Sequence, residues 1–211
     1  MHEKSPGADT TVELCGLTLR TPLIPGSGTL SKEALGEVEG VYGAMLPKTT
    51  TPAARSGNPP PRVAVPGKPI LAKLTNEGVV ENALAAESAG VDGLTIINTI
   101  PALTVDARAR KVLVRGGLSG PAIKPVALRA VYDVSGVVSV PVVGSGGVVS
   151  GTDVAEFMLA GAAAVQIGTA SFVRDPHEIL DEFTAYLNDN DLGAAELTGA
   201  LRSVRSRQPA I

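Results

Sequence analysis

The fold is decided by residues 141–169, which read PVVGSGGVVSGTDVAEFMLAGAAAVQIGT. This stretch opens with an apolar run and a glycine-rich loop, and it closes with a second apolar run at Ala164–Ile167. Between the two runs, Ser150 and Asp153 have the spacing of a capping box, and Gly161 is placed to end the helix that they begin. Two short apolar runs joined by a capped helix are typical of a strand-helix-strand unit with parallel strands.

Similar short apolar runs extend outward from this unit along most of the chain. Such runs, almost continuous and bounded by glycine or polar residues, are typical of parallel strands that are buried on both faces. The predicted strands are Leu23–Pro25, Ala44–Leu46, Ile70–Ala72, Leu94–Ile97, Pro141–Val143 and Ala164–Ile167.

Helical segments separate several of these runs. Asn76 is a candidate cap for a helix over Val79–Ala89 that ends at Gly90, and Asp175–Glu178 has the form of a capping box with proline in the first turn. A weak repeat also relates the two halves, because similar strand-helix units begin at proline and end with Ala-Gly before the next run. The sequence therefore predicts an α/β fold of the TIM-barrel type, because barrel units are equivalent by rotation.

The predicted barrel is a truncated one with about six core strands. Val12–Arg20 alternates apolar and polar residues around a glycine and predicts a short N-terminal hairpin. We expect a disordered N-terminus over residues 1–11, one domain over residues 12–200, and a flexible tail over residues 201–211.

Composition excludes several classes of function. A net charge of −3 with 3% aromatic residues leaves neither the basic surplus nor the stacking side chains expected of a nucleic-acid-binding protein. The apolar runs are too short to span a membrane, so we expect a cytoplasmic protein. With Cys15 as the one cysteine and two histidines, the sequence also argues against a disulfide and a Cys/His metal site.

The loops that follow the predicted strands are small and polar, and in a barrel they meet at one face. Gly146 and Gly147 follow one strand and Gly168 and Thr169 another, while residues 116–120 form a third glycine-rich element. Glycine lets backbone N–H groups approach an anion, and the helix that opens near Ser150 would add its positive end, so these loops predict phosphate binding. The alternative is that glycine only permits tight turns between strand and helix.

Three further side chains lie at predicted strand ends. Lys48 and Lys73 would be partly withdrawn from water, so each needs a partner such as an anionic ligand, unless its ammonium reaches the solvent along the barrel rim. Asn98 has donors and acceptors suited to a planar amide-type ligand, although it could equally cap its own loop. Cys15 falls in the hairpin, away from this face, and is predicted to be structural.

Several of these motifs together resemble the dihydroorotate dehydrogenase family. Gly-Gly-Leu-Ser-Gly-Pro-Ala-Ile-Lys-Pro at residues 116–125 is most similar to the catalytic subunit of the two-subunit, NAD-linked class. The resemblance extends from Val12 to about Leu187. The other motifs that carry it are Val12–Gly28, Lys48–Thr50, Gly57–Val63, Ile97–Thr99, Gly144–Val148 and Gly168–Ala170.

The resemblance implies an FMN-dependent oxidoreductase that converts dihydroorotate to orotate in pyrimidine biosynthesis. It places Ser27 and Thr49 along the flavin, Lys73 beside the flavin pyrimidine edge and Ile97 against the flavin ring. Lys48 is assigned both to the cofactor site and, with Asn98 and Thr99, to the substrate. The phosphate cradle implied by the family consists of Gly120, Gly146, Gly147, Gly168 and Thr169.

The chain departs from the family pattern at one place. Residues 62–64 pass almost directly to Lys68–Lys73, where the family has two further strand-helix units that include the cysteine acting as general base. No catalytic residue is therefore identified, and dihydroorotate oxidation is in doubt, because a general base contributes about 10²–10⁴-fold to the rate. The alternatives are a non-catalytic flavin- or phosphate-binding barrel subunit and another barrel that acts on a phosphorylated metabolite.

Two kinds of protein partner follow from the same reading. The family's NAD-linked class works with an iron–sulphur flavoprotein that transfers electrons to NAD. The omitted units would leave strand edges that could pair with a second copy of the chain, which predicts a possible homo-oligomer.

Overall fold

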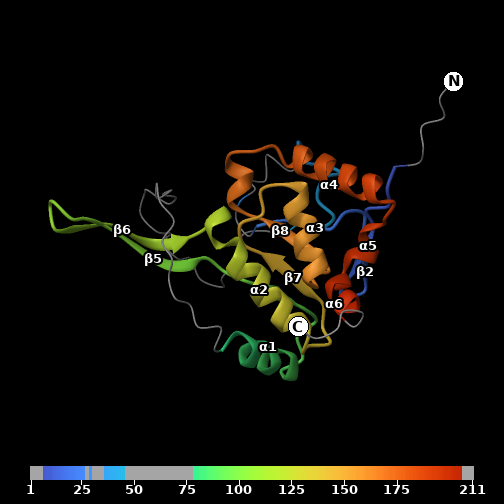
Figure 1. The fold of residues 1–211 in the computed structure, drawn as a ribbon, viewed down its shortest axis with the longest axis horizontal. Helices are drawn as coiled ribbons and strands as arrows, with labels where there is room; N and C mark the ends of the chain where they lie inside the picture. The colour runs from blue at the N-terminus through green and yellow to red at the C-terminus, as the bar shows by residue number, and fades with distance from the viewer. Residues whose placement is uncertain (1–6, 27–28, 30–35, 46–77, 206–211) are drawn as a thin grey trace.

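The computed structural model describes residues 7–26, 29, 36–45 and 78–205 (Figure 1). Their central element is a four-stranded parallel sheet in the order β3-β8-β7-β4. These strands are β3 (Leu23–Pro25), β4 (Leu94–Ile96), β7 (Val142–Ser145) and β8 (Ala164–Ile167). Each one coincides closely with a predicted apolar run, so the α/β class with a parallel sheet is confirmed for this part of the chain.

Helices follow the strands and pack around this sheet, as Figure 1 shows for α2 and α3. α3 begins at the Ser150 cap and ends at Gly161, whose φ of 119° is left-handed, so this predicted helix is confirmed. The helices of the described residues are α1 (Val79–Ser88), η2 (Pro121–Ile123), α2 (Lys124–Ser135), α3 (Gly151–Ala160), η3 (Thr169–Phe172), α4 (Pro176–Asn190), α5 (Ala194–Leu197) and α6 (Ala200–Arg205).

The helices α1 and α4 begin close to the predicted residues, but their capping contacts differ in part from the predicted ones. Asp175 does cap α4, by accepting a hydrogen bond from the His177 backbone N–H. Glu178 does not complete the predicted capping box, because its carboxylate accepts a hydrogen bond from Arg174 instead. Gly78 is the cap residue of α1, and the predicted cap Asn76 lies outside the described residues.

The core lies between the sheet and the inner faces of α2, α3 and α4. Phe157 and Met158 of α3 and Phe183 of α4 are completely buried. Gly144 of β7 lies under the Phe157 ring, and a Cβ atom at residue 144 would come within 2.5 Å of that ring. This contact explains why the strand carries glycine at its centre.

The predicted N-terminal hairpin is present. β1 (Val12–Leu14) pairs with β2 (Leu17–Leu19), and the turn between them has positive φ at both Cys15 and Gly16. The Cys15 thiol donates to the Asp92 carbonyl oxygen at 3.1 Å, just before β4 begins. The hairpin therefore lies at the amino ends of the parallel strands.

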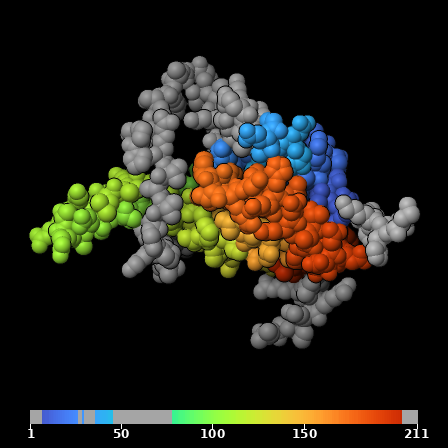
Figure 2. Space-filling view, turned by 90° about the horizontal axis from the view of Figure 1, so that it is seen from above, coloured from blue at the N-terminus to red at the C-terminus, as the bar shows by residue number. Residues whose placement is uncertain are grey.

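A second hairpin was not predicted from the sequence. β5 (Ile100–Asp106) pairs with β6 (Lys111–Leu118), and the two strands form an arm that extends away from the body (Figures 1 and 2). Gly116 and Gly117 lie in β6, so the third glycine-rich element is a strand end and not one continuous loop. The arm is anchored at its base by a small cluster of Ile100, Leu118 and Ile123.

Two predicted strands have a different outcome. Ile70–Ala72 lies outside the described residues. Ala44 and Met45 are not in a strand, although the neighbouring Gly43 N–H donates to the Leu23 carbonyl oxygen of β3 at 2.9 Å. The segment thus runs beside β3 without regular strand geometry, and closure into a barrel of six strands stays a prediction.

Candidate functional site

The candidate site lies where the four parallel strands end. Their carboxyl ends share one edge of the sheet, and the loops after them are joined to neighbouring strands. The Ile97 N–H donates to the Ser145 carbonyl oxygen at 2.9 Å, and the Gly26 N–H donates to the Ile167 carbonyl oxygen at 2.7 Å. Loops that are separate in sequence are thereby held side by side.

The loop after β7 packs directly against the segment that contains Gly120. A Cβ atom on Gly147 would lie 2.8 Å from the Gly120 carbonyl oxygen and 2.9 Å from the Lys124 backbone nitrogen. A Cβ atom on Gly146 would lie 2.8 Å from Ala127 and 3.5 Å from Ile97. Both glycines have positive φ, 130° at Gly146 and 85° at Gly147, so glycine is required here by conformation and by space.

The loop after β8 completes this group. The Thr169 hydroxyl donates to the Ser119 hydroxyl at 2.8 Å, and its methyl group lies near Gly120. A Cβ atom on Gly26 would lie 2.8 Å from the Gly168 Cα, whereas the Cβ position of Gly168 faces open space. The structure therefore brings together the five residues that the family resemblance implies as a phosphate cradle, namely Gly120, Gly146, Gly147, Gly168 and Thr169.

Backbone donors are available in this cradle. Across the described ranges, no acceptor contacts the N–H groups of Gly146, Gly147, Gly168 or Thr169. Backbone N–H groups without a protein acceptor, in glycine-rich loops after parallel strands, favour an anion. The donor set therefore fits a phosphate group.

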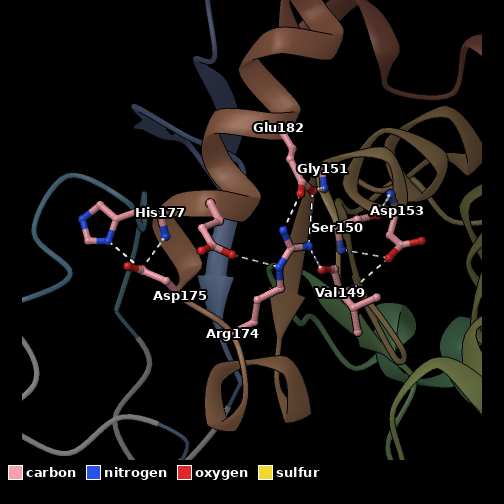
Figure 3. A network of polar contacts seen from close by, with 9 residues as sticks. Val149, Ser150, Gly151, Asp153, Arg174, Asp175, His177 and Glu182 are labelled. Carbon is pink, nitrogen blue, oxygen red and sulfur yellow. Dashed lines mark hydrogen bonds and ion pairs between the residues drawn. The ribbon is translucent and has the colours of Figure 1, made fainter.

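The beginning of α3 differs from the prediction. The sequence suggested that this helix end would add its positive charge to an anion, but carboxylates of the chain already occupy it (Figure 3). Asp153 accepts from the N–H groups of Val149 and Ser150 at 2.8 and 2.9 Å, and Glu182 of α4 accepts from Gly151 at 2.8 Å. An anion is therefore left with the loop N–H groups and not with the first turn of α3.

Lys124 forms an ion pair with the buried Asp153, which was not predicted from the sequence. The Lys124 ammonium lies 2.5 Å from Asp153 and 2.8 Å from Glu156, and the Asp153 side chain is 7% exposed. Burial acts to raise the pKa of Asp153, but hydrogen bonds from Lys124, Val149 and Ser150 outweigh it, so the pKa is lowered. Hydrogen bonds to Asp153 and then Glu156 raise the pKa of Lys124. Lys124 is part of the family-like motif at residues 116–125, whereas its partner Asp153 belongs to the capping box at the start of α3.

The loop after β4 supplies the predicted substrate residues. Ile97 is half-buried beside Gly146, whereas Asn98 and Thr99 are exposed. The Asn98 side-chain oxygen accepts from the Thr99 N–H at 2.7 Å, and the Thr99 side chain packs where a Cβ atom on Gly117 would lie. Asn98 therefore caps its loop, as one of its two interpretations held, and its roles and those of Thr99 toward a substrate stay predictions.

The remaining predicted site residues, Ser27, Lys48, Thr49 and Lys73, lie outside the described residues. Cys15 lies at the amino ends of the strands, opposite the cradle, as predicted. Within the part of the chain that the structure describes, no cluster of three potential metal ligands occurs. None of the described helices combines the length and apolar character of a membrane span.

Comparison with known proteins gives a consistent family. A family model described as dihydroorotate dehydrogenase matches residues 64–187. The catalytic subunit of dihydroorotate dehydrogenase B (NAD(+)) from Geobacter metallireducens is 47% identical over 144 residues, which is 64% of this chain and 47% of that protein. The corresponding subunit from Trichlorobacter lovleyi is 49% identical over 142 residues, again 64% of this chain and 47% of that protein.

A solved structure supports the same relationship. Dihydroorotate dehydrogenase from Eimeria tenella, in complex with ferulenol, superposes with a TM-score of 0.51 at 27% identity. The alignment covers 65% of this chain and 37% of the Eimeria chain. The chain spans about half the length of the curated relatives it matches.

Proposed function

The chain belongs to the dihydroorotate dehydrogenase family, and on this premise we propose that it is an FMN-dependent oxidoreductase that converts dihydroorotate to orotate in pyrimidine biosynthesis. The observation that carries the proposal is the cradle of Gly120, Gly146, Gly147, Gly168 and Thr169 at the carboxyl edge of the sheet. The phosphate of FMN is an anion of the size and charge that such a cradle accepts.

The proposed role of each loop follows from what it offers. The N–H groups of Gly146, Gly147, Gly168 and Thr169 would bind the phosphate, and Ile97, half-buried beside Gly146, would present an apolar surface to the flavin ring. Ser27, Thr49 and Lys73 are proposed along the flavin from the family pattern.

The reacting side of the site is proposed to follow the same pattern. Lys48, Asn98 and Thr99 would hold the carboxylate and ring amides of dihydroorotate. Asn98 keeps its amide NH₂ group for this purpose, because its oxygen is already bonded to Thr99. FMN, when bound, supplies the electron-accepting group of the reaction.

The position of Cys15 in the fold favours a second candidate function. It is the one cysteine of the sequence, and it lies at the amino ends of the strands with its thiol bonded to Asp92. It is therefore not placed to remove a proton from a substrate at the opposite edge. The second candidate is a flavin- or phosphate-binding barrel subunit that does not oxidise dihydroorotate.

Partners and location are part of the proposal. The names of the relatives describe a catalytic subunit, which supports association with an electron-transfer subunit, here proposed to be an iron–sulphur flavoprotein. We also propose a homo-oligomer, on the ground of the strand edges expected from the sequence, and a cytoplasmic location, on the ground of composition.

A visible absorption spectrum of the purified protein with FMN tests these functions. The spectrum is recorded without oxygen, before and after addition of dihydroorotate. A bound flavin band that bleaches supports the dehydrogenase, and a bound band that does not bleach supports the second candidate. Absence of bound flavin after incubation with excess FMN would contradict the dehydrogenase and the flavin-binding form of the second candidate.

A further inference from the structure

Arg174 lies between the two loops of the phosphate cradle and contacts both of the elements that follow them. Its backbone N–H donates to the Ala170 carbonyl oxygen at 2.9 Å, which fixes it to η3, directly after Gly168 and Thr169. Its guanidinium donates to the Val149 carbonyl oxygen at 2.6 Å, two residues after Gly147. One side chain therefore links the loop after β8 to the loop after β7.

Glu182 completes this link from α4 (Figure 3). Its carboxylate forms an ion pair with Arg174 and also accepts from the Gly151 N–H at 2.8 Å. The contact is possible because Gly151 lies against the α4 backbone, where a Cβ atom would come within 2.1 Å of the Phe183 nitrogen. Arg174 and Glu182 thus hold both ends of the segment Val149–Gly151.

Arg174 and Glu182 differ from an ordinary surface ion pair because each is also bonded to a backbone group of another element, the Val149 carbonyl oxygen and the Gly151 N–H. Arg129 and Asp133 form a comparable pair on α2, but they are four residues apart on one helix and join no separate elements. A pair of that kind contributes little. The three donor nitrogens of Arg174 instead reach Val149, Glu178 and Glu182, so the geometry is fixed from several sides.

We propose that Arg174 and Glu182 are positioning residues that fix the Gly146–Gly147 loop relative to the Gly168–Thr169 loop and so set the affinity of the cradle for a phosphate group. The inference rests on the proposed function for the identity of the ligand. Neither side chain needs to touch that ligand, because the cradle donors are backbone N–H groups whose spacing depends on the two loops.

Binding of FMN is compared with binding of riboflavin, which has the same ring without the phosphate. We expect Arg174→Gln and Glu182→Gln to weaken FMN binding about tenfold and to change riboflavin binding less than about twofold. Arg129→Gln is the matched control and should change neither. Because Arg174 and Glu182 pair with each other and hold the same segment, Val149–Gly151, the double variant should lose less affinity for FMN than the two single losses added together.

Amide hydrogen exchange tests the positioning itself without any flavin. In Arg174→Gln, exchange should become faster at Val149–Gly151 and at Ser171 and Val173, whose N–H groups donate hydrogen bonds in and beside the two loops, and stay unchanged in α2. Glu182→Gln is close in shape to the original residue and serves if Arg174→Gln does not fold. Unchanged exchange in both loops overturns the proposal, as does an equal loss of FMN and riboflavin binding.

The two proposals can fail separately. If the original protein binds no FMN but the variants still accelerate exchange in both loops, the positioning role stands and the proposed function fails. If FMN binds and the variants neither weaken it selectively nor change exchange, the proposed function stands and the positioning role fails.

Discussion

The carbonyl oxygen of Gly120 lies 2.8 Å from the point that a Cβ atom on Gly147 would occupy. This approach joins the end of the β5–β6 arm to the loop after β7, and it leaves no room for a side chain. A phosphate cradle built in this way depends on glycine at residue 147 for its shape and not only for its flexibility.

We therefore expect Gly147→Ala to weaken FMN binding at least tenfold. Gly90→Ala is a matched control, because Gly90 has the same φ of 85° with open space around its Cβ position. Each change should cost about 1–2 kcal/mol of stability from the left-handed backbone. Only Gly147→Ala should lose affinity for FMN in a titration followed by flavin fluorescence, and equal affinities in the two variants would contradict this account.

The cradle could be predicted from the sequence because each of its parts is local. Glycines after an apolar run predict a close backbone turn, and parallel strands bring such turns to one edge. The capping of α3 could not be predicted in full, since Glu182 reaches Gly151 from a different helix. A contact of this kind depends on tertiary packing, and the sequence around Ser150 carries no signal for it.

Asp153 gives a prediction about stability. Asp153→Asn should lower the free energy of unfolding by about 2 kcal/mol at pH 7, because the Lys124 ammonium then loses its most buried partner. Asp133→Asn, which breaks an exposed pair on α2, should cost about 0.5 kcal/mol or less. Denaturant unfolding measures both, and similar losses in the two variants would show that burial of Asp153 adds nothing to the strength of its ion pair.

The same residue gives a pH dependence. Burial raises the pKa of Asp153, but hydrogen bonds from Lys124, Val149 and Ser150 lower it further than burial raises it. The group therefore stabilises the folded protein above the ordinary carboxyl pKa, and this contribution is lost as pH falls through the lower, folded value. Between pH 7 and pH 3 the original protein should lose more stability than Asp153→Asn does. Parallel losses would contradict the assigned direction.

The β5–β6 arm shows why part of the fold was missed. β6 carries Arg115 and two glycines after its apolar residues, and β5 has a bulge between Thr104 and Val105, so the apolar pattern is not continuous. β6 is exposed on both faces up to Leu118, and β5 alternates only between exposed and half-buried residues after Ile100, so burial imposes little apolar-polar alternation on the sequence. β3, β7 and β8 were predicted because they are buried on both faces, a condition that the arm does not meet.

Burial along the arm predicts that truncating two leucines of β6 will have very different costs in stability. Leu118 is 7% exposed in the cluster with Ile100 and Ile123, whereas Leu113 is 57% exposed. Leu118→Ala should cost about 2–3 kcal/mol, and Leu113→Ala less than about 0.5 kcal/mol. Because Gly120 follows this cluster directly, Leu118→Ala should also weaken FMN binding. Equal costs at the two sites would show that the arm is not anchored as described.

The position of Cys15 predicts that this residue takes no part in FMN binding or in proton removal from a substrate. Its thiol donates to the Asp92 carbonyl oxygen at the amino ends of the strands, while the cradle lies at their carboxyl ends. Cys15→Ser should therefore leave FMN affinity unchanged and should leave the rate of any dihydroorotate-dependent flavin bleaching within about twofold of the original protein, since a serine hydroxyl can keep the bond to Asp92. Anaerobic stopped-flow absorbance measures the rate. A loss of about 10²-fold or more with FMN still bound would identify Cys15 as the general base and would require a different placement of the substrate.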